Sequence, residues 1–151
     1  MTRPSLAFLL TQVGAHANAT YAEHLIPLDL SPPLTATLRV VQENGGISQQ
    51  ELATRVQSHP SRIVGIVDTL EDRGLVRRTA ARSDRRANEV YVTEKGKECL
   101  GRLAAVEKTF QSELFAGLSA QERETLAGLL AKIAEQQGLS PGIHPGFRSR
   151  T

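Results

Sequence analysis

Five arginines are concentrated between Val76 and Val92, where the sequence reads VRRTAARSDRRANEVYV. Only two acidic residues, Asp84 and Glu89, accompany them, and the whole chain has a net charge of just +2. Positive charge gathered on one short segment predicts contact with a polyanion, of which nucleic acid is the first candidate. The arginines are Arg77, Arg78, Arg82, Arg85 and Arg86.

Two short helices are predicted directly before this segment. The sequence Ser48-Gln-Gln-Glu51 has the spacing of a capping box, in which serine and glutamate satisfy each other's backbone N–H groups, and it opens a helix to about Val56. Ser58 is expected to cap the next helix, which accepts Pro60 in its first turn and ends at Gly74. This pair of helices predicts a helix-turn-helix.

The second of these helices is predicted to be amphipathic. Its buried stripe is expected to hold Ile63, Ile66, Val67 and Leu70. The opposite face carries Ser61, Arg62, Gly65 and Thr69.

The arginine-rich segment itself is expected to form a β-hairpin. Val76–Thr79 and Glu89–Val92 are short strand-like runs, and the stretch between them is too long for a tight turn, so it should project as a wing. The sequence therefore predicts a mostly α fold with a small β-hairpin wing (α+β), with a winged helix-turn-helix over about residues 31–96.

Further helices are predicted on both sides of this unit. Their expected ranges are about Ser5 to about His24, Ser31-Pro32-Pro33 to Asn44, Thr93 to about Leu118, and a last helix opened by a second capping box at Ser119–Glu122.

The terminal helices carry apolar stripes longer than a small winged domain could cover, which predicts a partner surface. We therefore expect one domain over 1–151, with about 1–30 and 97–151 forming a dimerisation region. The tail from Gly138 onward is rich in Gly and Pro, and Ile143 and Phe147 indicate that it docks on the molecule.

Composition and motifs argue against several classes of protein. There is no run of about 18 apolar residues and no convincing signal peptide, so we expect a cytoplasmic protein without a membrane partner. A single cysteine and four histidines without ligand spacing predict no metal and no cofactor. The absence of Trp argues against a single-strand binder that stacks bases. No nucleophile elbow, phosphate-binding glycine loop or paired-carboxylate arrangement is present, so catalysis is not expected.

The order of these elements resembles the MarR family of bacterial transcription regulators. The most specific features are VDTLEDRGLVRR, Asp84-x-Arg86 in the wing, and Thr93-Glu94-Lys95-Gly96 after it. The resemblance implies that Arg86 enters the minor groove of DNA and that Asp84 orients it. It also implies an obligate homodimer whose first, fifth and sixth helices interlock, with the recognition helices about one turn of DNA apart on a pseudo-palindrome.

The predicted DNA contacts follow from this resemblance and from the exposed faces. Gly65 stands where many relatives have a larger polar or basic residue, so base reading is expected to rest more on Ser61, Arg62 and the wing. The full set is Ser48, Gln49, Pro60, Ser61, Arg62, Gly65, Arg77, Arg82, Asp84, Arg85 and Arg86.

A polar stripe on the first helix suggests an effector site. His16, Thr20 and His24 follow each other at i, i+4 spacing, close to Asn18 and Tyr21. The resemblance implies a small aromatic acid or phenol, bound between the dimerisation region and the DNA-binding lobe, that releases a repressor from its operator. The alternative is that these groups only form hydrogen bonds in the dimer interface.

Two further alternatives remain open at this stage. Cys99 lies near a helix N-terminus that could lower its pKa, which would suit a redox-responsive regulator. A winged helix can also serve as a protein-interaction module. Salt-sensitive binding to duplex DNA would distinguish a DNA-binding regulator from a protein-interaction module.

Overall fold

The computed structural model describes residues 3–80 and 88–144. Within these ranges the helices are α1 (Leu6–Leu25), η1 (Ile26–Leu28), α2 (Pro32–Glu43), α3 (Gln49–Arg55), α4 (Pro60–Asp72), α5 (Glu94–Leu114) and α6 (Ala120–Gln136), and the strands are β1 (Ile47–Ser48), β2 (Val76–Ala80) and β3 (Asn88–Val92). The predicted fold class, mostly helical with a small β-hairpin, is confirmed.

The sheet is antiparallel, with the strand order β1-β3-β2. Val76 pairs with Val92 and Ala80 with Asn88 in the hairpin, while Ile47 of β1 pairs with Val90 on the other side of β3. The sequence did not indicate β1, because two residues are too few to show the alternating pattern of a strand. This short strand fixes the start of α3 against the hairpin.

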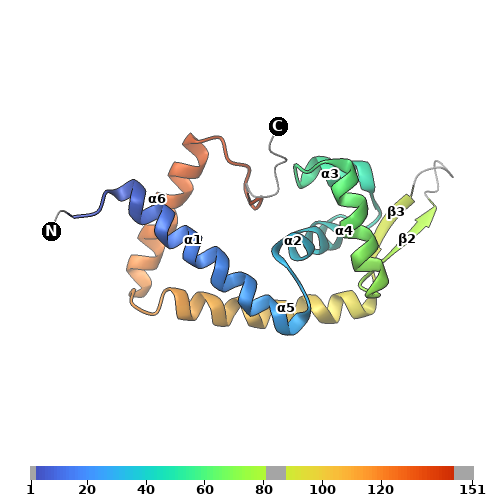
Figure 1. Ribbon diagram of the computed structural model, residues 1–151, viewed down its shortest axis with the longest axis horizontal. Helices are drawn as coiled ribbons and strands as arrows, with labels where there is room; N and C mark the ends of the chain where they lie inside the picture. Colours follow the sequence, from blue (N-terminus) through green and yellow to red (C-terminus); the bar gives the residue numbers. More distant parts are fainter. Residues whose placement is uncertain (1–2, 81–87, 145–151) are drawn as a thin grey trace.

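The hydrophobic core lies where α2, α3, α4 and the sheet pack together, at one end of α5 (Figure 1). The predicted buried stripe of α4 is confirmed, with Ile63, Val67 and Leu70 fully buried and Ile66 partly buried against the core. Leu25 and Leu103 extend this core to α1 and α5. The fully buried side chains are Leu25, Leu38, Leu52, Ile63, Leu70, Leu103, Val41, Val67, Val76, Val90 and Thr37.

The predicted caps at the starts of two helices, α4 and α3, need correction. His59, not Ser58, caps α4, because its Nδ1 accepts a hydrogen bond from the Ser61 N–H. At α3 only half of the capping box forms: Ser48 Oγ accepts from the Glu51 N–H, whereas the Glu51 carboxylate binds Arg55. The second capping box, Ser119 with Glu122, forms as predicted.

Helix α5 ends at Leu114 rather than at about Leu118. The four residues that follow form a turn, in which the Leu118 N–H donates to the Phe115 carbonyl at 3.0 Å. The Arg123 side chain donates to the carbonyls of Phe115 and Leu118 at 2.8 and 3.1 Å. This arginine from α6 thus satisfies acceptors at the end of α5, which a sequence pattern within α5 alone cannot reveal.

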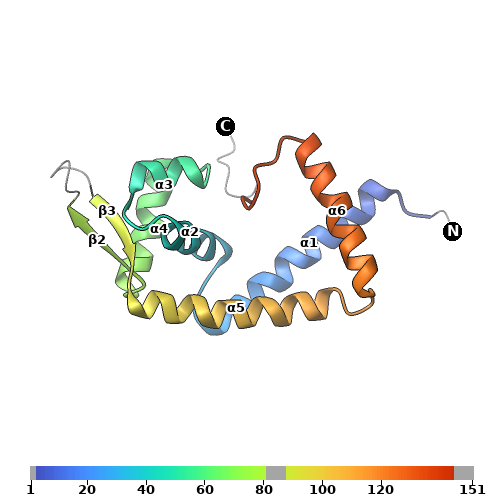
Figure 2. The same cartoon turned by 180° about the vertical axis from the view of Figure 1, so that it is seen from behind.

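Helix α6 and the N-terminal part of α1 lie at the far end of α5, away from the core, whereas the C-terminal end of α1 reaches the core through Leu25 (Figures 1 and 2). None of the residues of α6 is buried. Both helices expose large apolar side chains, which in the range 3–144 are Leu6, Phe8, Leu9, Leu10 and Val13 on α1 and Leu129, Leu130 and Ile133 on α6. No helix in the described ranges is both long enough and apolar enough to cross a membrane.

The contact between α5 and the hairpin depends on Gly96. A Cβ atom at this position would lie 2.1 Å from the Leu75 carbonyl oxygen and 2.6 Å from Val92 Cγ1. That carbonyl also accepts the Thr93 N–H at 3.1 Å, so it is held in place.

We predict that Gly96→Ala destabilises the protein by about 1 to 3 kcal/mol or prevents folding, because the backbone must move to admit the methyl group. Gly101→Ala is the matched control on the same helix, since a Cβ there meets no atom within 4 Å. It should stabilise by about 0.5 to 1 kcal/mol, as Gly→Ala does in an open helix position. Urea denaturation measures both, and a Gly96→Ala variant as stable as the wild type would contradict the close approach.

Candidate nucleic-acid interface and ligand pocket

The N-terminal cap of α4 lies beside the exposed face of this helix. Ser61, Arg62 and Gly65 are exposed on this face, as predicted, and so is Pro60 in the first turn. The Ser61 hydroxyl lies 2.7 Å from His59 Nδ1, which also accepts the Ser61 N–H. The imidazole therefore sets the position of the first hydroxyl on the exposed face.

Val64 belongs to the same face and was not among the predicted contact residues. Its side chain is 41% exposed although it sits in the middle of α4. An exposed valine beside Gly65 is an apolar surface of the kind that contacts the methyl group of thymine. Its helical position, one residue before Gly65 and off the buried stripe, was the signal that could have identified it.

Arg78 on β2 joins the hairpin to both helices of the helix-turn-helix. Its guanidinium donates to Glu71 Oε2 and to Asp68 Oδ1, each at 2.5 Å, and its Nε donates to Gln49 Oε1 at 2.6 Å. The Arg78 N–H also donates to Glu71 at 2.9 Å. This backbone bond, with the guanidinium, lowers the pKa of Glu71.

The neighbouring arginine in β2 points the other way. Arg77 is exposed, and its guanidinium carbon lies 4.9 Å from the centre of the Tyr91 ring. The Tyr91 hydroxyl donates to Glu89, two residues earlier on β3, at 2.8 Å. Arg77 is thus available to a ligand, whereas Arg78 is committed to the fold.

The other predicted contacts divide into two groups. Ser48 and Gln49 are half-buried at the start of α3, where Ser48 caps the helix and Gln49 binds Arg78. Four residues of the wing lie outside the described residues: Arg82, Asp84, Arg85 and Arg86.

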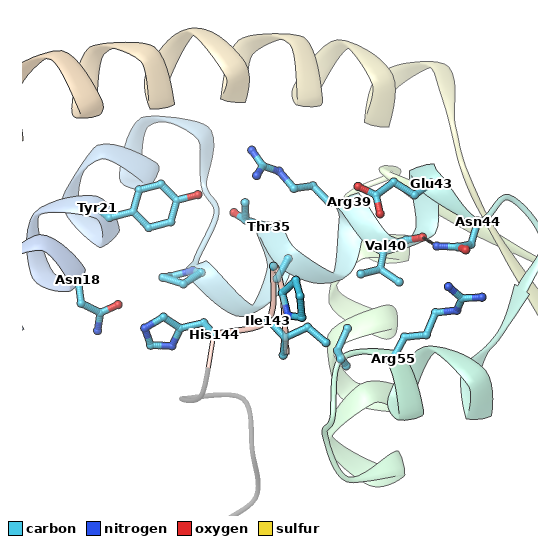
Figure 3. Close-up of a pocket in the computed structure, with 15 residues that line it drawn as sticks. Asn18, Tyr21, Thr35, Arg39, Val40, Glu43, Asn44, Arg55, Ile143 and His144 are labelled. Atoms are coloured by element: carbon cyan, nitrogen blue, oxygen red, sulfur yellow. Dashed lines mark hydrogen bonds between the residues drawn. The ribbon is translucent and has the colours of Figure 1, made fainter. Parts of the chain in front are cut away.

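A pocket of about 480 Å³ opens between α1, α2, α3 and the segment after α6 (Figure 3). Asn18 and Tyr21 of α1 stand on one side and Arg55 of α3 on the other, with Ile143 and His144 between them (Figure 3). Helix α2 supplies the longest wall, through Thr35, Ala36, Arg39, Val40 and Glu43.

A chain of polar contacts connects this pocket to α5. The Tyr21 hydroxyl donates to Glu107 at 2.7 Å, and Arg39 donates to the other oxygen of the same carboxylate. Burial raises the pKa of Tyr21, and the bond to Glu107 adds to the shift. Tyr21 therefore remains a neutral hydrogen-bond donor.

The predicted polar stripe on α1 is divided by the structure. Of its members only Tyr21 lines the pocket, joined there by Asn18, whereas His16, Thr20 and His24 do not. His16 is exposed. His24 instead faces α5, where its ring lies edge-on to Phe110 with the ring centres 5.5 Å apart.

The surroundings of His24 favour its protonated form. Its Nδ1 lies 2.9 Å from the Thr20 carbonyl and its Nε2 lies 2.8 Å from a Glu113 oxygen. Both partners are acceptors, so both contacts are hydrogen bonds when the ring is protonated. The hydrogen bond to the Thr20 carbonyl is the main cause of the raised pKa of His24, and Glu113 adds to it.

Cys99 is buried beside Arg73, Lys95 and Arg102. Burial raises the pKa of its thiol despite these three cations. A buried thiol with a raised pKa is a poor nucleophile at neutral pH. Within the described residues no group of three or more His, Cys, Asp and Glu could hold a metal ion.

The two adjacent arginines of β2 should differ in their effect on stability. We predict that Arg78→Ala lowers the free energy of unfolding by about 1 to 2 kcal/mol, because partly exposed Asp68 and Glu71 lose their shared cation. Arg77→Ala, the matched control, should cost less than about 1 kcal/mol, the range of an exposed cation–π contact. Chemical denaturation checks this, and a larger loss for Arg77→Ala would refute the assignment.

The raised pKa of His24 predicts a pH-dependent contribution to stability. A raised folded-state pKa stabilises the fold fully below the unfolded value of about 6.5, and the contribution is lost as pH rises through the folded value. Unfolding midpoints of wild type and His24→Gln should therefore differ most at acidic pH and converge at alkaline pH. Glu113→Gln should reproduce part of the loss, and a difference that grows with pH would disprove the pairing.

Comparison with known proteins identifies relatives of this chain. The MarR family model matches residues 30–87. A Thauera aromatica protein assigned to regulation of the hcr operon is 34% identical over 112 residues, which cover 74% of this chain and 68% of that protein.

Solved structures agree with this match. The transcriptional repressor CouR, bound to a 23-mer DNA duplex, has a TM-score of 0.76 at 30% identity and covers 86% of this chain and 92% of its own. A MarR family protein of Mycobacterium tuberculosis in complex with DNA has a TM-score of 0.72 at 27% identity, with 87% and 98% covered. In complex with p-aminosalicylic acid, that protein has a TM-score of 0.68 at 28% identity, with 87% and 99% covered. The chain therefore belongs to the MarR family of transcriptional regulators.

Proposed function

We propose that this MarR-family regulator binds duplex DNA as a homodimer, with α4 in the major groove and the wing in the adjacent minor groove. The observation that carries this proposal is the exposed face of α4, with Ser61, Arg62 and Val64, fixed beside an arginine-bearing hairpin by Arg78. Two relatives of similar fold are bound to DNA in their structures. Arg77 and the wing arginines supply the charge that phosphate contacts require.

The exposed apolar side chains of α1 and α6 support a homodimer. Phe8 is 55% exposed, Val13 52% and Leu129 57%, on two helices that lie together at the end of the molecule opposite the wing (Figures 1 and 2). Exposed apolar side chains on two neighbouring helices favour association with a second copy. A dimer formed there leaves both copies of α4 free to face one duplex.

The pocket supports a small aromatic acid or phenol as effector. Val40 and Val56 offer apolar walls for a ring, and Arg39 and Arg55 offer charge for a carboxylate. The p-aminosalicylic acid complex of the Mycobacterium tuberculosis relative supports this class of ligand. A ligand that separates α1 from α2 would shift the spacing of the two recognition helices and release a repressor from a pseudo-palindromic operator.

The two alternative functions gain no specific support. The burial of Cys99 disfavours a thiol sensor. A protein-interaction module would not require the cationic hairpin, and salt-sensitive duplex binding separates it from a DNA-binding regulator.

We predict specific duplex binding by a dimer with a Kd of about 10 nM or tighter at physiological salt. Arg62→Ala should relax base preference at one position by roughly 1 to 3 kcal/mol, whereas Arg86→Ala should weaken binding to all sequences and reduce the salt slope by about 1. Titration on selected palindromic DNA, with light scattering for the oligomeric state, measures these effects.

Lys108→Ala, an exposed change on α5, is the control and should leave affinity and salt slope unchanged. A monomer that binds with full specificity contradicts the dimer. An unchanged salt slope in Arg86→Ala contradicts the role of the wing.

We predict that Ala36→Leu, which fills the pocket from α2, abolishes the response to salicylate-like compounds. Wild-type operator affinity should fall roughly 5- to 150-fold with a saturating effector, a coupling of about 1 to 3 kcal/mol. His16→Ala is the control and should respond like the wild type, because His16 does not line the pocket. Thermal shift finds the ligand, and operator titration with and without it measures the response; a full response in Ala36→Leu would exclude this pocket.

A further inference from the structure

The segment after α6 returns to the DNA-binding lobe. Helix α6 ends at a left-handed Gly138 (φ 65°), whose N–H donates to Glu135, while the Leu139 N–H donates to Ala134 at 2.9 Å. These bonds close the helix and turn the chain back. The segment then descends between α6 and α3 (Figures 1 and 2).

Residues 141–144 form one wall of the pocket described above. The Gln57 side-chain amide donates to Ser140 Oγ, and the Ile143 N–H closes a turn to the Ser140 carbonyl at 3.2 Å. Four consecutive residues, 141–144, line the pocket, and the Ile143 side chain is half-buried there beneath α2 (Figure 3). The predicted docking of the tail is confirmed at Ile143, whereas Phe147 lies outside the described residues.

The anchor on the lobe is the turn of the helix-turn-helix. Gln57 has a positive φ of 52°, a conformation that is uncommon for a residue with a side chain. Two bonds hold this turn: the Gln57 N–H donates to Thr54 at 3.2 Å and the Ser58 N–H to Ala53 at 3.0 Å. His59, the cap of α4, follows immediately.

We propose that residues 140–144 are a latch that closes the ligand pocket and ties α6 to the turn before the recognition helix. Within the latch, Ser140 makes the contact with Gln57, and residues 141–144 line the pocket. Any molecule that enters the pocket meets Ile143 and His144, so these side chains help to set which ligands fit. The ligand part rests on the proposed effector function, whereas the latch itself does not.

Hydrogen exchange of the full-length protein without ligand tests the latch. Ser140→Ala and Ile143→Ser should each speed exchange of the Gln57 and Ser58 amides roughly two- to tenfold, the effect of losing about one hydrogen bond or small apolar contact. Ser112→Ala on α5 and Leu139→Ser, both exposed and outside the pocket, are the matched controls. Rates in Ser140→Ala and Ile143→Ser equal to those of the controls would overturn the latch.

Binding of salicylate, used as a probe, tests whether Ile143 forms part of the ligand site. Calorimetry should show a Kd raised by about fivefold or more in Ile143→Ser relative to Leu139→Ser, because apolar contact with the ligand is lost. Equal affinities in the two variants would show that Ile143 is not part of the site. If the wild type does not bind salicylate, the effector proposal loses its support, and the exchange rates still decide the latch.

Discussion

One guanidinium group joins the hairpin to both helices of the helix-turn-helix, the parts that we propose to contact DNA. Arg78 contacts Asp68 and Glu71 of α4, Gln49 of α3, and through its own backbone belongs to the hairpin. The guanidinium carries five donors in one rigid plane, which allows this side chain to hold three partners in fixed directions. The direction in which the hairpin projects from α4 therefore depends on this cluster, and so does any simultaneous contact of helix and wing with DNA.

A second polar cluster connects that lobe to the helices of the proposed dimer. Tyr21 of α1 and Arg39 of α2 meet on Glu107 of α5, at the edge of the pocket. A ligand in the pocket would lie against two of these three side chains. Because the exposed apolar faces lie at one end of α5 and the recognition helix at the other, small changes at this junction would be carried over the length of α5.

The sequence allowed the order of elements, the buried stripe of α4 and the exposed face of α4 to be predicted, because each follows from local spacing. Arg77 but not Arg78 was among the predicted DNA contacts, yet the sequence could not show what holds Arg78, since Asp68, Glu71 and Gln49 come from other elements. The polar stripe of α1 did not define the pocket for a similar reason: Tyr21 and His24 both lie against Phe110 of α5, but of the two only Tyr21 also lines the pocket. The pocket itself required Ile143, from the far end of the chain.

Hydroxyl-radical footprinting of the protein on a selected operator tests most directly whether two recognition helices and two wings engage one duplex. The account predicts two protected segments on one face of the DNA, with centres about 10 base pairs apart and minor-groove protection on their outer sides. A single protected segment, or protection without a twofold pattern, would contradict it.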